Sequence, residues 1–345
     1  MRTSFLCELD ASTYTSKKEN KKLRGESYWK EKYGKIEKAI DKLKCSFRKE
    51  FVVRVTVFTP TYNRKEKLHR LYEKLMNQTS DDFEWLIVDD GSNDGTEDIV
   101  NQFIKCTDKF AIRYLKKKNG GKYTAYNLGV IQAKGDLFVC VDSDDFLEET
   151  AIEELIVLYE KIKDKTYNGI IALKRDARGK ILSDKLPSGI EKCKLIELGQ
   201  KYNCKGEFTL IYKTNIARKY LFPAINNEKF MSECVVYDQI DQQGDMYLFN
   251  QVLTVCEYCE DGYTQNFMRV VLNNPTGYQI YYRQRIDMAA SFRERFGYIV
   301  RYHAFKRMAN NDEYIYKGAN KFLVASFSPV GYLAYRLYMR KKRKL

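Results

Sequence analysis

Two short clusters of carboxylates stand out because each follows an apolar run of strand length. Asp89 and Asp90 follow the sequence WLIV at 85–88, and Asp142, Asp144 and Asp145 follow or end the stretch LFVCVDSDD at 137–145. Continuous apolar runs of this kind are typical of strands buried on both faces of a parallel sheet. Ligands of open α/β sheets bind outside the carboxyl ends of the strands. The sequence therefore predicts that both clusters meet at one binding rim.

The second cluster has the chemistry of a metal and phosphate site. Asp142 and Asp144 are two positions apart, so in an extended chain both side chains point to the same side. Carboxylates gathered at one rim repel one another unless something cationic is bound. Oxygen ligands without a nearby His or Cys suit Mg²⁺ or Mn²⁺, held jointly by carboxylates and substrate phosphates. Ordinary turn chemistry around Asp90 and a helix N-cap at the second cluster are the simpler alternatives.

Alternating strands and helices are expected to position these clusters. Residues 51–58 form a β-branched and aromatic run, which the turn at 59–64 ends. Leu68, Leu71 and Leu75 recur on one face of a helix, and a second helix is expected through Phe103 and Ile104. A short strand at 111–115 and a helix at 123–133 complete the series. This alternation predicts right-handed crossovers and a parallel sheet.

The motifs of residues 53–147 resemble those of family 2 glycosyltransferases of the GT-A fold. They are FTPTYNR at 58–64, FEWLIVDDGSNDGT at 83–96, NGGK at 119–122, AYN at 125–127, AKGD at 133–136 and VDSDD at 141–145. Looser matches at 222–223, 228–233, 261–264 and 274–277 resemble a subgroup that builds bacterial surface polysaccharides. The resemblance implies a Rossmann-like α/β fold with a mixed, mostly parallel sheet flanked by helices. Helical appendages are expected at both ends of the chain.

The resemblance also implies which residues would hold the nucleoside of a sugar-nucleotide. Pro60 and Tyr62 match positions that line the base pocket in the family. Asp89 or Asp90 would accept hydrogen bonds from the uracil ring or the ribose hydroxyls. The first acidic cluster is therefore expected to recognise the nucleoside.

Another group of residues would hold the diphosphate. Asp142 and Asp144 match the family's Asp-x-Asp motif, with Ser143 between them, and are expected to bind Mn²⁺ or Mg²⁺ beside the sugar-nucleotide. Lys122 and Asn127 lie in the strip where the family often contacts the nucleotide. A lysine is chemically suited to offset diphosphate charge. The second acidic cluster is therefore expected to bind the diphosphate leaving group through its metal ion.

Glu233 is the candidate for the catalytic base. The resemblance assigns this position to removal of the acceptor hydroxyl's proton, although the Cys234 that follows departs from the Glu-Asp of many relatives. Attack opposite the leaving diphosphate gives direct displacement with inversion. The resemblance thus implies a metal-dependent hexosyltransferase that moves a sugar from a UDP-sugar to a saccharide acceptor, lipid-linked, in cell-surface polysaccharide synthesis.

Two other classes of function stay open at this point. A nucleotidyltransferase would share the sheet and the acidic pair, but the expected glycine-rich loop with a basic residue is replaced by TPTYN at 59–63. A non-catalytic scaffold that binds sugar-nucleotides or polysaccharides would need the same binding residues without turnover. A nicotinamide-binding domain is disfavoured because no G-x-G-x-x-G follows the first strand.

The formal net charge of +14 sits largely at the two ends of the chain. Residues 1–50 hold 14 Lys and Arg against 8 acidic residues, and residues 336–345 hold six basic residues and no acid. A nucleic-acid groove would place the excess on the folded body, so no nucleic-acid partner is expected. Nine cysteines without a secretory signal favour a reducing, cytoplasmic environment.

The carboxyl-terminal region combines apolar and basic character. Residues 322–335 are uncharged and rich in Phe, Leu, Val and Tyr, and they precede the basic run at 336–344. Fourteen residues are too few to span a bilayer of ~30 Å hydrocarbon. We expect peripheral contact with the inner face of a bacterial plasma membrane. Packing of a terminal helix on the catalytic body is the alternative.

Four regions are expected along the chain. An extension at 1–50 contains an amphipathic helix, whose apolar seam at 29–47 packs on the catalytic domain or forms a homo-oligomer contact. Residues 51–150 form the half that binds the nucleotide-sugar, and residues 151–282 form the acceptor half. Residues 283–345 form a helical region with the basic, membrane-facing tail.

Overall fold

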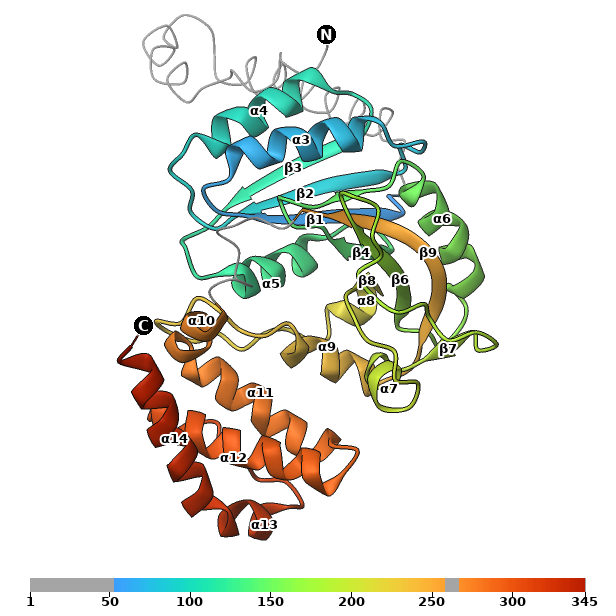
Figure 1. Ribbon diagram of the computed structural model, residues 1–345. Coiled ribbons are helices and arrows are strands. Elements are labelled where there is room, and N and C mark those ends of the chain that lie inside the picture. The colour runs from blue at the N-terminus through green and yellow to red at the C-terminus, as the bar shows by residue number, and fades with distance from the viewer. Residues whose placement is uncertain (1–52, 258–266, 345) are drawn as a thin grey trace, which may run out of the picture. The chain divides into compact units, whose positions relative to one another are not determined.

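A nine-stranded mixed sheet organises the part of the chain that the structure, a computed structural model, describes: residues 53–257 and 267–344 (Figure 1). The strand order is β3-β2-β1-β4-β8-β6-β9-β5, with β7 paired to β9. The amphipathic helix expected at 29–47 lies outside the described residues. The predicted α/β class with a mixed, mostly parallel sheet is confirmed, since most residue pairs of the sheet belong to parallel ladders.

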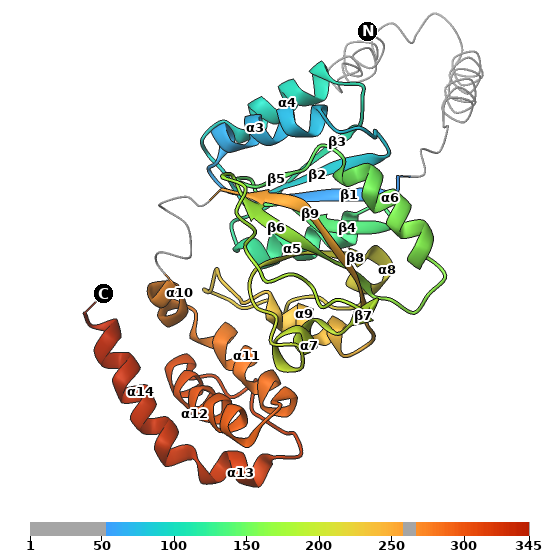
Figure 2. The same ribbon diagram turned by 45° about the vertical axis from the view of Figure 1, so that its right-hand side comes forward.

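The first four strands along the sheet are parallel, as the βα alternation predicts. The strands are β1 (Val55–Thr61), β2 (Phe83–Asp89), β3 (Ala111–Lys116) and β4 (Leu137–Cys140). The helices between them are α3 (Lys65–Met76), α4 (Thr96–Cys106) and α5 (Lys122–Gln132). Figures 1 and 2 show α3 and α4 on one face of the sheet and α5 on the other.

Burial on both faces explains the continuous apolar runs. Trp85 and Ile87 of β2 pack in the cluster that contains the apolar faces of α3 and α4. Leu86 and Val88, which point to the opposite face, pack with Tyr126 and other residues of α5. All seven residues of β2 are buried. Neither face of β2 meets solvent, so its sequence lacks the apolar and polar alternation of a half-exposed strand.

The first strand extends further than its sequence predicts. The predicted turn at 59–64 is wrong in its first half, since β1 continues through Pro60 to Thr61, and Thr61 pairs with Asp89. On the other side of β1, strand β4 pairs only as far as Phe58. The missing N–H of Pro60 therefore breaks no ladder bond. The actual turn contains Asn63 in a left-handed conformation, with φ of 51°.

The second half of the sheet is built from later segments. Its strands are β5 (Phe146–Leu147), β6 (Gly169–Asp176), β7 (Lys192–Cys193), β8 (Phe208–Lys213) and β9 (Met246–Cys256). Its helices are α6 (Ala151–Ile162), α7 (Leu195–Gln200), α8 (Thr214–Ala217) and α9 (Cys234–Asp241). Strand β8 pairs with β4 in the antiparallel direction. The two halves expected at 51–150 and 151–282 therefore share one sheet (Figure 2).

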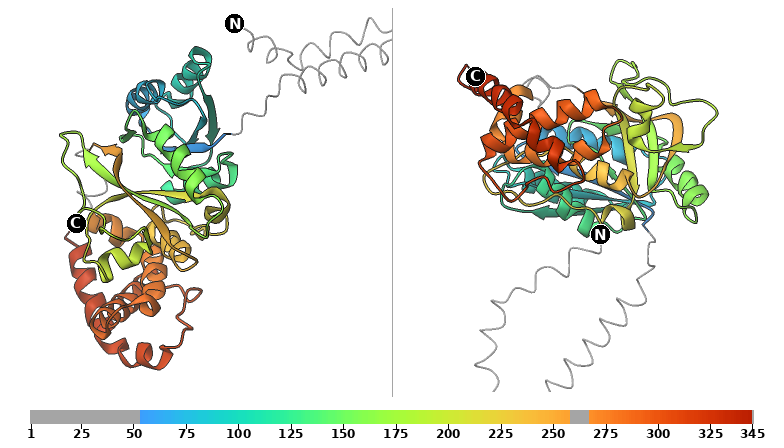
Figure 3. Two further views of the ribbon diagram at one scale, coloured as in Figure 1. Left: turned by 90° about the vertical axis from the view of Figure 1, so that its right-hand side faces the viewer. Right: turned by 90° about the horizontal axis from the view of Figure 1, so that it is seen from below.

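Five helices follow the sheet in the described part of the chain, coloured orange to red in Figure 3. They are α10 (Phe267–Asn273), α11 (Pro275–Met288), α12 (Phe292–Ala309), α13 (Lys321–Ser326) and α14 (Ser328–Lys342). The helical region predicted from residue 283 thus begins earlier, with α10. Across the described ranges, none of the helices has the length and apolar character needed to cross a bilayer.

A buried ion pair joins this helical region to α9. The Arg285 guanidinium of α11 donates to both carboxylate oxygens of Asp238, at 2.6 and 2.7 Å. Gln284 donates to the same carboxylate at 3.2 Å. The Asp238 side chain is 4% exposed. Removal of one partner from such a pair leaves a buried charge without compensation.

We expect Arg285→Met to destabilise the protein by about 3–5 kcal/mol, because Asp238 would stay buried without its partner. Thermal unfolding of the purified full chain measures this effect. Arg293→Met, a change at an exposed position of α12, is the matched control and should leave the Tm nearly unchanged. Equal Tm values for the two variants would contradict this role of the ion pair.

Candidate active site

The carboxyl ends of β1, β2 and β4 bring the two acidic clusters to one edge of the sheet. β1 lies between β2 and β4, so Asp89 at the end of β2 and Asp142 just beyond β4 flank the same strand. The Asp90 amide donates to the Thr61 carbonyl at 2.8 Å, which fixes the first cluster against the end of β1. The convergence predicted from the sequence is therefore present.

Basic side chains of the chain itself compensate the second cluster. Lys122 at the start of α5 lies 2.7 Å from Asp142. Arg64, which follows β1, lies 2.5 Å from Asp144, and Lys174 of β6 lies 3.4 Å from Asp145. Charge repulsion among these carboxylates thus needs no bound metal to relieve it. Asp142 and Asp144 nevertheless offer the hard oxygen ligands that Mg²⁺ and Mn²⁺ prefer.

Lys122 also contacts the candidate base. Its ammonium lies 2.8 Å from the Glu233 carboxylate, at the N-cap of α9, as well as 2.7 Å from Asp142. Burial alone would lower the pKa of Lys122, but the charges of Asp142 and Glu233 raise it well above its usual value. Burial alone would raise the pKa of Asp142, and the charge and hydrogen bond of Lys122 lower it. One lysine therefore links the carboxylate that follows β4 to the carboxylate at the start of α9.

The first cluster is buried and engaged by protein donors. The Asp89 carboxylate accepts from the Ser92 amide at 2.7 Å and from the Tyr114 hydroxyl at 2.5 Å. The Asp90 carboxylate accepts from Lys117 at 2.6 Å and from the amides of Gly120 and Gly121 at 2.9 and 2.7 Å. Asp89 thus ties the loop after β2 to strand β3, and Asp90 ties the same loop to the loop after β3. A direct contact of either one with a nucleoside stays a prediction.

The remaining predicted site residues differ in exposure. Pro60 is buried in β1, whereas the Tyr62 ring at the end of that strand is 48% exposed. Ser143 is buried between the two aspartates. The Asn127 amide is fully engaged with Phe222, accepting from its N–H at 2.9 Å and donating to its carbonyl at 2.8 Å. Asn127 thus ties α5 to a distant segment, and its predicted nucleotide contact stays untested.

Three cations at this edge were not singled out from the sequence. Arg64 stood within the FTPTYNR motif, but its charge had no assigned partner there. Lys117 lies in a run of three lysines, where nothing local distinguishes the one that pairs with Asp90. Lys174 comes from β6, far from the motifs in sequence. Only the pairing of distant strands identifies these three residues.

The Asp145 side chain is less exposed than those of Asp142 and Asp144. Burial raises its pKa to about 6, while the charge of Lys174 opposes that shift. The Cys256 thiol, at the end of β9, donates to the same carboxylate at 3.2 Å. Within residues 53–257 and 267–344, no three His, Cys, Asp or Glu side chains are grouped so that they alone could hold a metal. A metal here would need oxygens from a bound phosphate as well.

A glycine brings the start of α5 against the segment before α9. Gly121 has φ of 93°, and a Cβ at this position would lie 1.9 Å from the Lys229 carbonyl oxygen. This approach sets the loop that carries Lys122 beside the segment that leads to Glu233. The second glycine of NGGK is therefore required by main-chain packing.

Comparison with known proteins finds a family match in this part of the chain. Residues 56–222 match the family model described as Glycosyl transferase family 2. Poly(ribitol-phosphate) beta-N-acetylglucosaminyltransferase TarP of Staphylococcus aureus is 39% identical over 104 residues, which cover 30% of this chain and 32% of TarP. Glycosyltransferase GlyG of Streptococcus pneumoniae is 32% identical over 117 residues, 34% of this chain and 38% of GlyG. The chain thus spans well under half the length of these curated relatives.

Solved structures match over a longer stretch. The crystal structure of residues 1–349 of S. aureus TarS superposes with a TM-score of 0.51 at 15% identity, covering 84% of this chain and 91% of that one. The same TarS fragment in complex with UDP-GlcNAc gives a TM-score of 0.50. At this identity the match shows a common fold.

We expect Gly121→Ala to destabilise the protein more than Gly179→Ala. Both glycines have positive φ, but no atom lies within 4 Å of a Cβ built at Gly179. Gly179→Ala should therefore cost only the strain of a left-handed residue, about 1–2 kcal/mol. Gly121→Ala adds a clash with main-chain atoms of Lys229. Thermal unfolding of both variants tests this difference, and equal Tm values would rule out the close approach.

Proposed function

The chain belongs to glycosyl transferase family 2 through residues 56–222, and from that premise we propose that it is an inverting glycosyltransferase. It would transfer a sugar from a UDP-sugar to a saccharide acceptor carried on a lipid, in the synthesis of a cell-surface polysaccharide. The observation that carries this proposal is Lys122, which contacts both Asp142 and Glu233. Asp142, proposed to face the diphosphate, is thereby linked to Glu233, whose carboxylate could act as a base.

The donor is proposed to lie along the carboxyl ends of β1, β2 and β4. Tyr62 presents a half-exposed ring at the end of β1 on which a uracil could stack. Asp89 and Asp90 shape the floor beside it, and Asp90 would reach the nucleoside only through a shift of Lys117 or the adjacent loop. UDP is the proposed nucleotide, because the TarS fragment binds UDP-GlcNAc and TarP is named for N-acetylglucosaminyl transfer. UDP-GlcNAc is therefore the first donor to assay.

Asp142 and Asp144 fit a divalent cation, Mn²⁺ or Mg²⁺. Both offer hard oxygen ligands, and a bound diphosphate would complete the coordination. When bound, the ion would stabilise negative charge on the departing diphosphate. Lys122 and Arg64, which now neutralise the two aspartates, would be free to turn their charge toward the phosphate oxygens.

Glu233 is proposed to accept the proton of the acceptor hydroxyl. As that oxygen forms its bond to the anomeric carbon, the bond from this carbon to the UDP oxygen breaks and its electron pair leaves with UDP. Attack from the face opposite UDP inverts the anomeric centre. The Glu233 side chain is 45% exposed, so the hydroxyl of an acceptor can approach its carboxylate.

Glu233→Gln should abolish transfer while UDP binding stays nearly native, because the amide keeps the shape of the side chain and cannot take up the proton. UDP release from UDP-GlcNAc and other UDP-sugars, together with calorimetric titration of UDP in the presence of Mn²⁺, measures both properties. Glu149→Gln, a change at an exposed glutamate beyond the second cluster, is the control. An active Glu233→Gln enzyme would reject the assignment. UDP binding without turnover in the native protein would favour a non-catalytic scaffold.

Peripheral membrane contact is proposed through α14. One face of this helix packs on α12, where a Cβ at Gly331 would lie 2.2 Å from the Cβ of His303. Val330, Leu333 and Leu337, spaced as one helical face, are exposed. Residues 314–345 contain eight basic and no acidic residues. The two alternatives for the tail are therefore compatible, because the helix packs on the body and still presents an apolar face beside a basic end.

The full chain should bind vesicles that contain phosphatidylglycerol and bind poorly to vesicles of phosphatidylcholine alone, with binding reduced by added salt. Replacing both Leu333 and Leu337 with Glu should weaken vesicle binding about tenfold or more, because it removes the apolar contact. Val157→Glu, at an exposed apolar position of α6, serves as control. Flotation with vesicles measures the bound fraction, and unchanged binding of the double variant would contradict this role of α14.

A further inference from the structure

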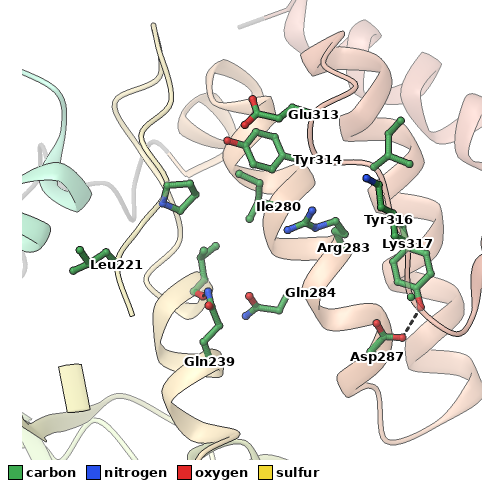
Figure 4. A pocket seen from close by; sticks show the side chains of 14 residues that line it. Leu221, Gln239, Ile280, Arg283, Gln284, Asp287, Glu313, Tyr314, Tyr316 and Lys317 are labelled. Atoms are coloured by element: carbon green, nitrogen blue, oxygen red, sulfur yellow. Dashed lines mark hydrogen bonds between the residues drawn. The ribbon is translucent and has the colours of Figure 1, made fainter. Parts of the chain in front are cut away.

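A cavity of about 610 Å³ lies between α9, α11 and two loops (Figure 4). The loops contribute Leu221, Pro223 and residues 313–318 to its wall. Its volume is within the range of small-molecule binding sites. None of the residues predicted to bind the donor lines it, so it is separate from the edge of the sheet described above.

Part of the cavity wall belongs to α9, the helix that begins next to the proposed base. Val235 and Gln239 line it from α9, the helix that begins directly after Glu233. Arg285 of α11 holds α9 through its buried pair with Asp238. The hydrogen bonds between Asn127 and Phe222 fix the 221–223 loop to α5, whose first residue is Lys122. The cavity therefore has a defined position beside the acceptor end of the site.

The loop that contributes residues 313–318 to the wall is held in place by contacts within the protein. Gln279 is fully buried and its side-chain amide donates to the carbonyls of Asn311 and Tyr314, both at 3.2 Å. The Arg283 guanidinium lies over the Tyr314 ring, 5.7 Å from its centre. The Tyr316 hydroxyl donates to Asp287 at 2.5 Å, which holds the other end of the same loop. A preformed wall reduces the entropy that a ligand must lose on binding.

The lining has balanced charge and many planar polar groups. Arg283 and Lys317 are matched in number by Asp287 and Glu313, and Gln239 and Gln284 add two amides. In Figure 4 the side chains of Arg283 and Gln284 project from α11 toward the space between the helices, with Tyr314 above them. A phosphate-rich ligand would require an excess of positive charge, and a lipid chain would require a more apolar wall. Hydroxyl groups suit this mixture of donors and acceptors, and a sugar ring can pack on Tyr314.

We propose that this cavity binds a neutral oligosaccharide, namely the sugar units of the acceptor that precede the one receiving the new residue. This inference rests on the proposed glycosyltransferase function. The cavity holds the acceptor chain, while Glu233 at the start of α9 contacts the reacting hydroxyl. Arg283 and Tyr314 are the residues that recognise the acceptor, by hydrogen bonding and by ring contact respectively.

Saturation-transfer NMR on the full chain tests this site with a panel of neutral tetrasaccharides built from glucose, mannose, galactose and N-acetylglucosamine. An acidic hyaluronan tetrasaccharide is the comparison ligand. We expect at least one neutral tetrasaccharide to bind and to bind about tenfold more weakly to Arg283→Ala and to Tyr314→Ala. Arg293→Ala, at an exposed position outside the cavity, should bind it like the native protein.

Calorimetric titration of UDP on the same samples separates this inference from the proposed function. UDP affinity should be equal in the native protein and in all three variants, which also shows that the variants are folded. Binding of none of the neutral tetrasaccharides, preference for the acidic one, or unchanged binding by both cavity variants would overturn the inference. Absence of UDP binding to the native protein would instead contradict the proposed function.

Discussion

The contact of Lys122 with both Asp142 and Glu233 is the interaction on which the rest of the site depends. The two carboxylates come from segments about ninety residues apart in the sequence, one after β4 and one before α9. Because both carboxylates contact the same ammonium, they lie close together and would repel one another without it. Its ammonium lies 2.7 Å from Asp142 and 2.8 Å from Glu233, and it fixes the first turn of α5 against both carboxylates. The proposed donor and acceptor sides of the site thus share one cation.

The remaining features of the fold maintain that contact. Gly121 permits the main chain before Lys122 to touch Lys229, and the glycines at 120 and 121 present their amides to Asp90. Asp90 is in turn neutralised by Lys117. Through these contacts Asp90, of the first acidic cluster, fixes the loop that carries Lys122. Asp89 and Asp90, which the sequence made conspicuous, therefore stabilise the loops of the site.

Most of the parallel half of the sheet could be predicted from the sequence, because its signals are local. The apolar run at 85–88 and the helical spacing of Leu68, Leu71 and Leu75 depend on neighbours in the chain, and both elements are present. The extension of β1 through Pro60 could not be predicted, since it depends on where the adjacent strand β4 ends. Three of the cations that neutralise the carboxylates were missed because their positions also depend on strand pairing. Arg64, Lys117 and Lys174 find their partners only through strand pairing.

Calorimetric titration of UDP with Mn²⁺, alongside an assay of sugar transfer, tests the coupling role of Lys122 most directly. Lys122→Met should lower UDP affinity about tenfold or more and abolish transfer, because the diphosphate loses a cation and Glu233 loses its partner. Lys118→Met, at an exposed position in the same lysine run, should behave like the native protein. Native UDP affinity and native transfer by Lys122→Met would contradict the account.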